Sequence, residues 1–94
     1  MPTFAVTYTY SDDAEVREAQ RPQHRAYLDA LPELRAAAAY AGEPPGALLV
    51  FVADSQERID DIVALDPFSA AGVITGVDVR EWNPVLGPGC AALV

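Results

Sequence analysis

The chain contains no lysine, and it has only one cysteine, one histidine, one methionine and one tryptophan among its 94 residues. Its six basic residues, all arginine, stand against 14 acidic residues and leave a formal net charge of −8. This balance argues against nucleic-acid binding, because such a site needs a basic stripe that neutralises phosphates. The acidic residues are scattered along the chain, so they predict a solvated surface and identify no partner.

Cys90 is the only cysteine, so no internal disulfide can form, and a structural zinc site would lack thiolate ligands. A single free thiol fits a reducing compartment, and we expect the protein in the cytoplasm. Residues 86–94, which include Cys90, are expected to form a flexible C-terminal tail, and we assign the thiol no functional role.

Long apolar runs are also missing. No stretch approaches the roughly 20 apolar residues that cross a bilayer, and no basic region precedes an apolar run at the N-terminus, so neither membrane spanning nor secretion is expected. The length predicts one domain over residues 1–94. Glycine-rich phosphate loops, Ser/His/Asp constellations and ligand clusters with metal spacing are absent from the sequence, so neither a metal nor an organic cofactor is expected.

Three segments have the pattern of β-strands. Residues 4–10 alternate large apolar or aromatic side chains with small or hydroxylated ones, as on a strand with two different faces. Residues 47–53 form a continuous run typical of a buried central strand, and residues 73–80 carry β-branched side chains at alternating positions. Residues 34–41 are ambiguous: their four alanines favour a helix, but the short segment ends in the turn-forming residues 42–46, and we favour a strand.

Helical segments are predicted between the first and second strands. Ser11 and Asp12 can cap a helical stretch, and Pro22 suits the first turn of a second helical segment, where its missing N–H needs no partner. This second segment should end near Leu31, because the residue before Pro32 is pushed away from helical geometry.

A further helix is predicted after the central strand. Asp54 and Glu57 resemble a capping box at its start, and Pro67 ends it at or before Asp66. The resulting order is β-α-β-β-α-β. This order predicts an α+β ferredoxin-like sandwich, with a four-stranded antiparallel sheet and helices on one face.

His24 is the strongest candidate for chemistry. It lies four residues before Leu28 and seven before Leu31, so its side chain shares their inward helix face. Imidazole is suited to acid–base work near neutral pH, and a carboxylate bound to one ring nitrogen makes the other nitrogen the basic one. Asp66 is the candidate carboxylate. Each residue also has a structural interpretation: His24 as a partly buried, hydrogen-bonded side chain, and Asp66 as the cap of a short helix that begins at Pro67.

Three further residues are candidates for binding a substrate. Arg21 can hold an anionic group through its fork of donors, or it can pair with Glu18 on the helix surface. Tyr8 and Phe68 can line a cavity that accepts an aromatic ligand, or they can pack in the core or in a dimer interface.

The chain resembles the YCII-like family in three segments: Arg21-Pro22-x-His24 ahead of a helix, residues 66–73 (DPFSAAGV) at a helix break, and residues 77–80 (VDVR) in the last strand. The resemblance extends from Phe4 to about Pro84. It implies a ferredoxin-like fold that pairs into a dimeric α/β barrel. It also places His24 and Asp66 at the two positions proposed as the family's active site.

What the resemblance implies about activity is broad. Most members have no established reaction, while relatives include a dehydrochlorinase of ring-cleavage pathways and the similarly folded muconolactone isomerases. The chain departs from the family pattern at residues 32–39, where members often carry a glycine-containing turn and this chain has PELR followed by alanines. This departure leaves the size and lining of any pocket open.

Two functions therefore stand as hypotheses. The first is a cofactor-independent lyase or isomerase that uses His24 and Asp66 to move a proton on a small cyclic or oxygenated organic compound. The alternative is a non-catalytic dimeric module that binds a small molecule or serves as an accessory subunit. A homodimer is expected in both cases, because a sheet with helices on one side leaves its other face to be covered.

Overall fold

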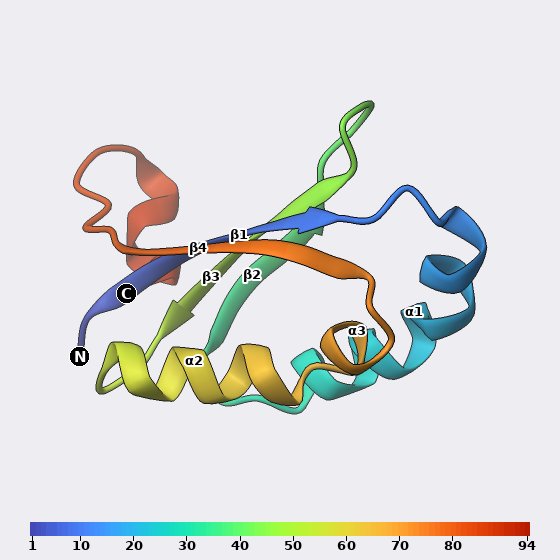
Figure 1. Cartoon of the computed structure of the whole chain (residues 1–94). Coiled ribbons are helices and arrows are strands. Elements are labelled where there is room, and N and C mark those ends of the chain that lie inside the picture. Colours follow the sequence, from blue (N-terminus) through green and yellow to red (C-terminus); the bar gives the residue numbers. More distant parts are fainter.

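One antiparallel sheet forms the centre of the computed structural model, which describes all 94 residues (Figure 1). The strands lie in the order β2-β3-β1-β4. Their bounds are Thr3–Tyr10 (β1), Leu34–Ala39 (β2), Gly46–Val52 (β3) and Ile74–Glu81 (β4). The helices are Ala14–Asp29 (α1), Gln56–Leu65 (α2) and Pro67–Ala70 (α3), and they share one face of the sheet (Figure 1). The ferredoxin-like order predicted from the sequence is confirmed.

The two faces of β1 explain where the core lies. Its large side chains Phe4, Val6, Tyr8 and Tyr10 are buried toward the helices. Opposite β1, strand β3 adds Leu49 and Phe51 to the same face, because antiparallel pairing aligns Val6 with Leu49 and Phe4 with Phe51. The helices complete this core with four buried apolar side chains: Leu28, Ile59, Ile62 and Phe68.

Residues 34–39 form an edge strand, as favoured from the sequence. Strand β2 pairs with β3 from Leu34 to Ala39, and the remaining edge of β2 is open. Backbone pairing along β3 satisfies the peptide groups of β2, and this tertiary interaction outweighs the helix propensity of the four alanines. Every residue of β2 after Leu34 is exposed, so this edge of the sheet is thinly covered.

The prediction of two helical segments before β2 is wrong. Helix α1 is continuous from Ala14 to Asp29, and Pro22 lies inside it rather than in its first turn. Pro22 lies on the exposed side of the helix, where water can solvate the carbonyl group that loses its hydrogen bond. The helix is capped by Asp13, whose side chain accepts from the Val16 N–H, and not by Ser11 or Asp12.

The cap of α2 also differs from the prediction. Ser55, and not Asp54, accepts the N–H of Arg58 through its hydroxyl group at 3.3 Å. The helix then ends at Leu65, ahead of Pro67, as expected from the position of the proline.

The C-terminal segment does not extend away from the domain. It contains a 3-10 helix, η1, over Pro88–Leu93, which contacts β2 and β3 on the side of the sheet opposite the α-helices (Figure 1). The Thr3 hydroxyl donates to the Leu93 carbonyl at 3.1 Å. Within residues 86–94 only Cys90 and Leu93 are partly buried, and the flexibility expected of this segment stays a prediction. None of the helices has the length and apolar character needed to cross a membrane.

Candidate active site

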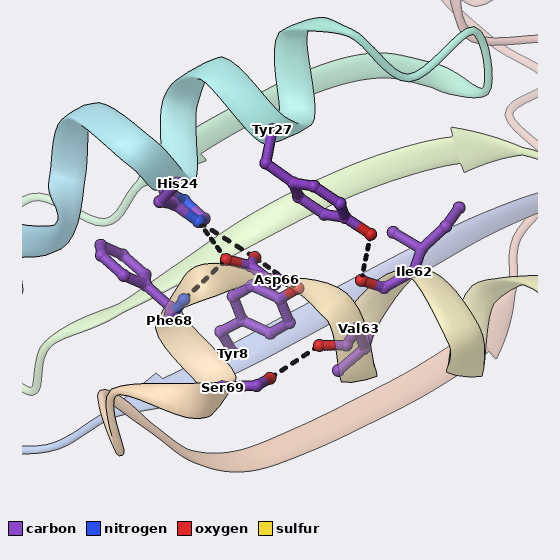
Figure 2. Close-up of polar contacts among 8 residues, drawn as sticks. All are labelled: Tyr8, His24, Tyr27, Ile62, Val63, Asp66, Phe68 and Ser69. Atoms are coloured by element: carbon purple, nitrogen blue, oxygen red, sulfur yellow. Dashed lines mark hydrogen bonds and ion pairs between the residues drawn. The ribbon is translucent and has the colours of Figure 1, made fainter.

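His24 and Asp66 meet beneath the sheet although 42 positions separate them in the chain (Figure 2). Helix α1 supplies the imidazole, and the break between α2 and α3 supplies the carboxylate. His24 Nδ1 lies 2.8 Å from Asp66 Oδ1 and 3.0 Å from Oδ2. Both residues are buried, with 8% and 1% of their surface exposed. The structure therefore contains the buried His–Asp contact that the mechanism requires.

Asp66 is held by three donors from three parts of the fold. Besides the imidazole, the Tyr8 hydroxyl donates to Oδ2 at 3.1 Å, and the Phe68 N–H donates to Oδ1 at 2.9 Å (Figure 2). The last bond is the N-cap of α3, which begins at Pro67. The structural and functional interpretations of Asp66 are thus compatible, since the same carboxylate caps a helix and contacts the histidine.

The contact determines which imidazole nitrogen is available. An ionised carboxylate can only accept, so beside an ionised Asp66 the proton of the neutral ring lies on Nδ1 and the lone pair lies on Nε2. Nε2 makes no hydrogen bond within the chain, and His24 lines a cavity. This arrangement presents a basic nitrogen to a ligand and holds a carboxylate behind the imidazolium that proton uptake would create.

Phe68 determines the orientation of the imidazole ring. The two rings stack with centroids 3.8 Å apart and planes only 4° from parallel. Tyr10 packs against the other rim of Phe68 in an edge-to-face arrangement, with centroids 5.5 Å apart. Helix α3 therefore positions the imidazole through two contacts: its N-cap residue Asp66 binds Nδ1, and its Phe68 ring stacks on the imidazole ring.

Two buried tyrosines next to the carboxylate remain protonated at neutral pH. Burial raises the pKa of Tyr8, and the neighbouring charge of Asp66 raises it further. Burial, with a smaller contribution from Asp66, raises the pKa of Tyr10 to about 12. The Tyr8 hydroxyl thus serves as a hydrogen-bond donor to Asp66 and not as a base.

A cavity of about 110 Å³ opens between α1, α3 and strands β2 and β3. Its lining is mostly apolar and contains Tyr10, Arg21, His24, Arg25, Leu28, Ala37, Ala38, Ala39, Ala47, Leu49 and Phe68. A shallower groove of about 700 Å³ adjoins it between α1 and β2 and shares Arg25, Leu28 and the three alanines with it. Because the side chains of β2 are small, the groove stays open, and it connects the cavity to solvent.

The predicted site residues have different positions relative to the cavity. His24, Phe68 and Arg21 line it, and Asp66 lies directly behind His24. Arg21 Nη2 also pairs with Glu18 Oε1 at 2.6 Å, so the surface ion pair is present, and the binding of an anionic group by Arg21 stays a prediction. Tyr8 does not line the cavity; it lies in the core and contacts Asp66.

Arg25 and the alanines of β2 also line the cavity, although they were not predicted from the sequence as site residues. Arg25 had a usable signal, because it lies four positions after Arg21 and therefore on the same helix face. The alanines had none, since their place in the cavity depends on the pairing of β2 with β3. No group of three or more histidine, cysteine, aspartate or glutamate side chains in the structure is arranged to hold a metal ion.

Comparison with solved structures shows the same fold in several proteins. The chain is similar to 5-chloro-2-hydroxyhydroquinone dehydrochlorinase (TftG) from Burkholderia phenoliruptrix AC1100, with 23% identity, a TM-score of 0.78, and coverage of 85% of this chain and 92% of that one. It is less similar to FFRP-DM1, with 19% identity, a TM-score of 0.54, and coverage of 85% and 96%. An antibiotic biosynthesis monooxygenase shows 12% identity, a TM-score of 0.54, and coverage of 92% and 100%.

Comparison with curated protein sequences gives no match. The model of the YCII-related domain, in contrast, matches residues 1–83, which is nearly the whole of the folded unit. This match agrees with the fold and with the segments that carry the resemblance. The chain therefore belongs to the YCII family.

Proposed function

We propose that this protein is a lyase or isomerase that uses no cofactor and moves a proton on a small cyclic, oxygenated organic compound, with His24 as the base. The observation that carries the proposal is the buried Nδ1–carboxylate contact, which leaves Nε2 of a cavity-lining histidine unpaired. The similarity to a dehydrochlorinase supports elimination chemistry on a cyclic substrate, while the low identity leaves the substrate of this chain to experiment.

The proposed step balances without an added reactant. Nε2 takes a proton from a carbon or hydroxyl group next to a carbonyl group, and the released electron pair forms an enolate or a new double bond. In elimination, the pair of the broken C–H bond forms the double bond, the departing group leaves with the pair of its own bond to carbon, and the imidazolium gives its proton to that group or to water. In isomerisation, the imidazolium returns the proton at another atom. Asp66 contacts Nδ1 throughout and stabilises the positive charge of the imidazolium.

The first test is proton exchange, because any substrate whose proton Nε2 removes reversibly will take up deuterium from D₂O. We expect the protein to accelerate deuterium incorporation into members of a panel of cyclic diketones, hydroxyquinones and cyclic keto acids. Proton NMR measures the incorporation as loss of the substrate's proton signals. Buffer with an equal concentration of an unrelated acidic protein is the control. Compounds that bind but exchange only at the buffer rate would contradict the proposal and favour the binding module.

We further propose that two copies pair through the part of the sheet face opposite the α-helices that η1 leaves uncovered, which would complete the dimeric barrel implied by the family. Leu48 is 40% exposed on this face, and Ala36 and Ala38 beside it are exposed. We expect a mass of about 20 kDa by light scattering, twice the 10.0 kDa of one chain. Leu48→Glu should shift the protein to monomer. The control is Leu65→Glu, which changes an exposed leucine on α2 and should leave the dimer intact. A monomeric wild type would refute the pairing.

A further inference from the structure

The distribution of charge around the cavity is opposite to that of the chain. The protein has 14 acidic and six basic residues, yet the cavity is lined by two arginines and by no aspartate or glutamate. Arg21 and Arg25 lie one helical turn apart on α1, and His24 lies between them in sequence. Arg21 and Arg25 thus bring two positive charges to the lining itself. Two neighbouring carboxylates lie outside the lining: Glu18 pairs with Arg21, and Asp66 lies behind His24.

Both arginines have unused hydrogen-bonding capacity. Arg21 Nε is buried without a partner, although Nη2 of the same group contacts Glu18. Arg25 makes no hydrogen bond or ion pair with another residue and lies where the cavity meets the groove. A buried guanidinium N–H without an acceptor is unfavourable, so a ligand oxygen at this point would satisfy it.

A third donor lies in the same cavity. The Tyr10 hydroxyl makes no hydrogen bond within the chain, and its ring packs against Phe68, which stacks on His24. The polar side chains of the lining thus consist of Tyr10, the two arginines and the histidine. The arginines only donate, and the acceptors are the Tyr10 hydroxyl oxygen and, when the ring is neutral, His24 Nε2. This set of donors calls for a ligand that brings acceptor oxygens.

We propose that the substrate is a small carboxylic acid whose carboxylate binds Arg21 and Arg25 and whose apolar body lies against Phe68 and the alanines of β2. The proposal rests on the proposed function in assigning the cavity to the substrate. A guanidinium fork matches a carboxylate, and the neighbouring Nε2 then faces the carbon skeleton of the acid. The ion pair with Glu18 is no obstacle, because Glu18 is largely exposed and such surface pairs contribute little net free energy.

The test compares benzoate with benzamide, which has nearly the same shape but no charge, and follows the His24 ring resonances by NMR. We expect benzoate to bind the wild type at least tenfold more tightly than benzamide, and added salt to weaken only benzoate. Arg21→Gln and Arg25→Gln should each raise the Kd for benzoate about tenfold. Arg35→Gln removes the same charge from an exposed site on β2 that lines neither the cavity nor the groove, and it should change the Kd less than twofold.

Equal binding of benzoate and benzamide to the wild type would overturn the proposal, as would an unchanged Kd in both cavity variants. The comparison of the two ligands in the wild type needs no variant to fold. Deuterium exchange separates this proposal from the acid–base function. If carboxylates bind through the arginines but no cyclic acid exchanges its proton, the carboxylate site is supported and the acid–base function is refuted. If only uncharged compounds exchange, the acid–base function is supported and the carboxylate substrate is refuted.

Discussion

Replacing Asp66 with alanine is expected to lower the free energy of unfolding by about 3–5 kcal/mol. The carboxylate is 1% exposed and accepts bonds from His24, Tyr8 and Phe68. Its removal leaves the imidazole, the phenol and the first turn of α3 without their acceptor in a region that water does not reach. The cost is large because three buried donors lose one partner at once. Urea unfolding, followed by circular dichroism, measures the difference.

Two control variants make this expectation specific. Asp66→Asn keeps the volume and one carbonyl acceptor, so it should cost less, about 1–3 kcal/mol. Asp61→Ala removes an exposed carboxylate from α2 and should change the free energy of unfolding by no more than about 0.5 kcal/mol. A loss below about 1 kcal/mol for Asp66→Ala would show that the three contacts do not stabilise the fold as described.

Replacing His24 with glutamine is expected to slow deuterium exchange by about 100-fold to 10,000-fold, the range that a positioned general base contributes. The glutamine amide can still donate to Asp66, so the carboxylate keeps a partner. The amide cannot take up a proton at neutral pH, so the chemical step loses its base. Initial rates at saturating substrate measure the effect on the step itself rather than on binding.

The controls for this variant are unfolding in urea and benzoate binding, which is followed here by the ring resonances of benzoate because the variant has no histidine. Glutamine at position 24 leaves both arginines in place, so the Kd for benzoate should change less than about threefold, and the free energy of unfolding should fall by less than about 2 kcal/mol. If His24→Gln retained more than a tenth of the wild-type exchange rate, another group would be the base.

The order of helices and strands along the chain could be predicted because three of the four strands carry a local pattern of their own. Residues 4–10 alternate in two faces, and the buried run before α2 has the β-branched and apolar character of a central strand. The region of α1 was harder. Pro22 is a strong helix-breaking signal in isolation, yet the helix continues through it, because the flanking turns pack His24 and Leu28 into the core.

Part of the candidate site could also be predicted from local sequence patterns. His24 lies on an inward helix face and Asp66 precedes a proline, so each residue could be selected from its neighbours alone. The resemblance to the family paired them. The local signal for Tyr8 was correct about burial, but it did not distinguish a side chain that lines the cavity from one that anchors the carboxylate.

The sequence by itself determined strands β1, β3 and β4, the inward position of His24 and the capping of α3 by Asp66, because these properties depend on residues within a few positions of one another. The tertiary structure alone decided that Nδ1 meets the carboxylate, that Phe68 stacks on the imidazole, and that two arginines border a cavity walled by alanines. These contacts join α1, β2 and α3 across long stretches of chain. Their geometry follows from the packing of the helices on the sheet, which no local pattern contains.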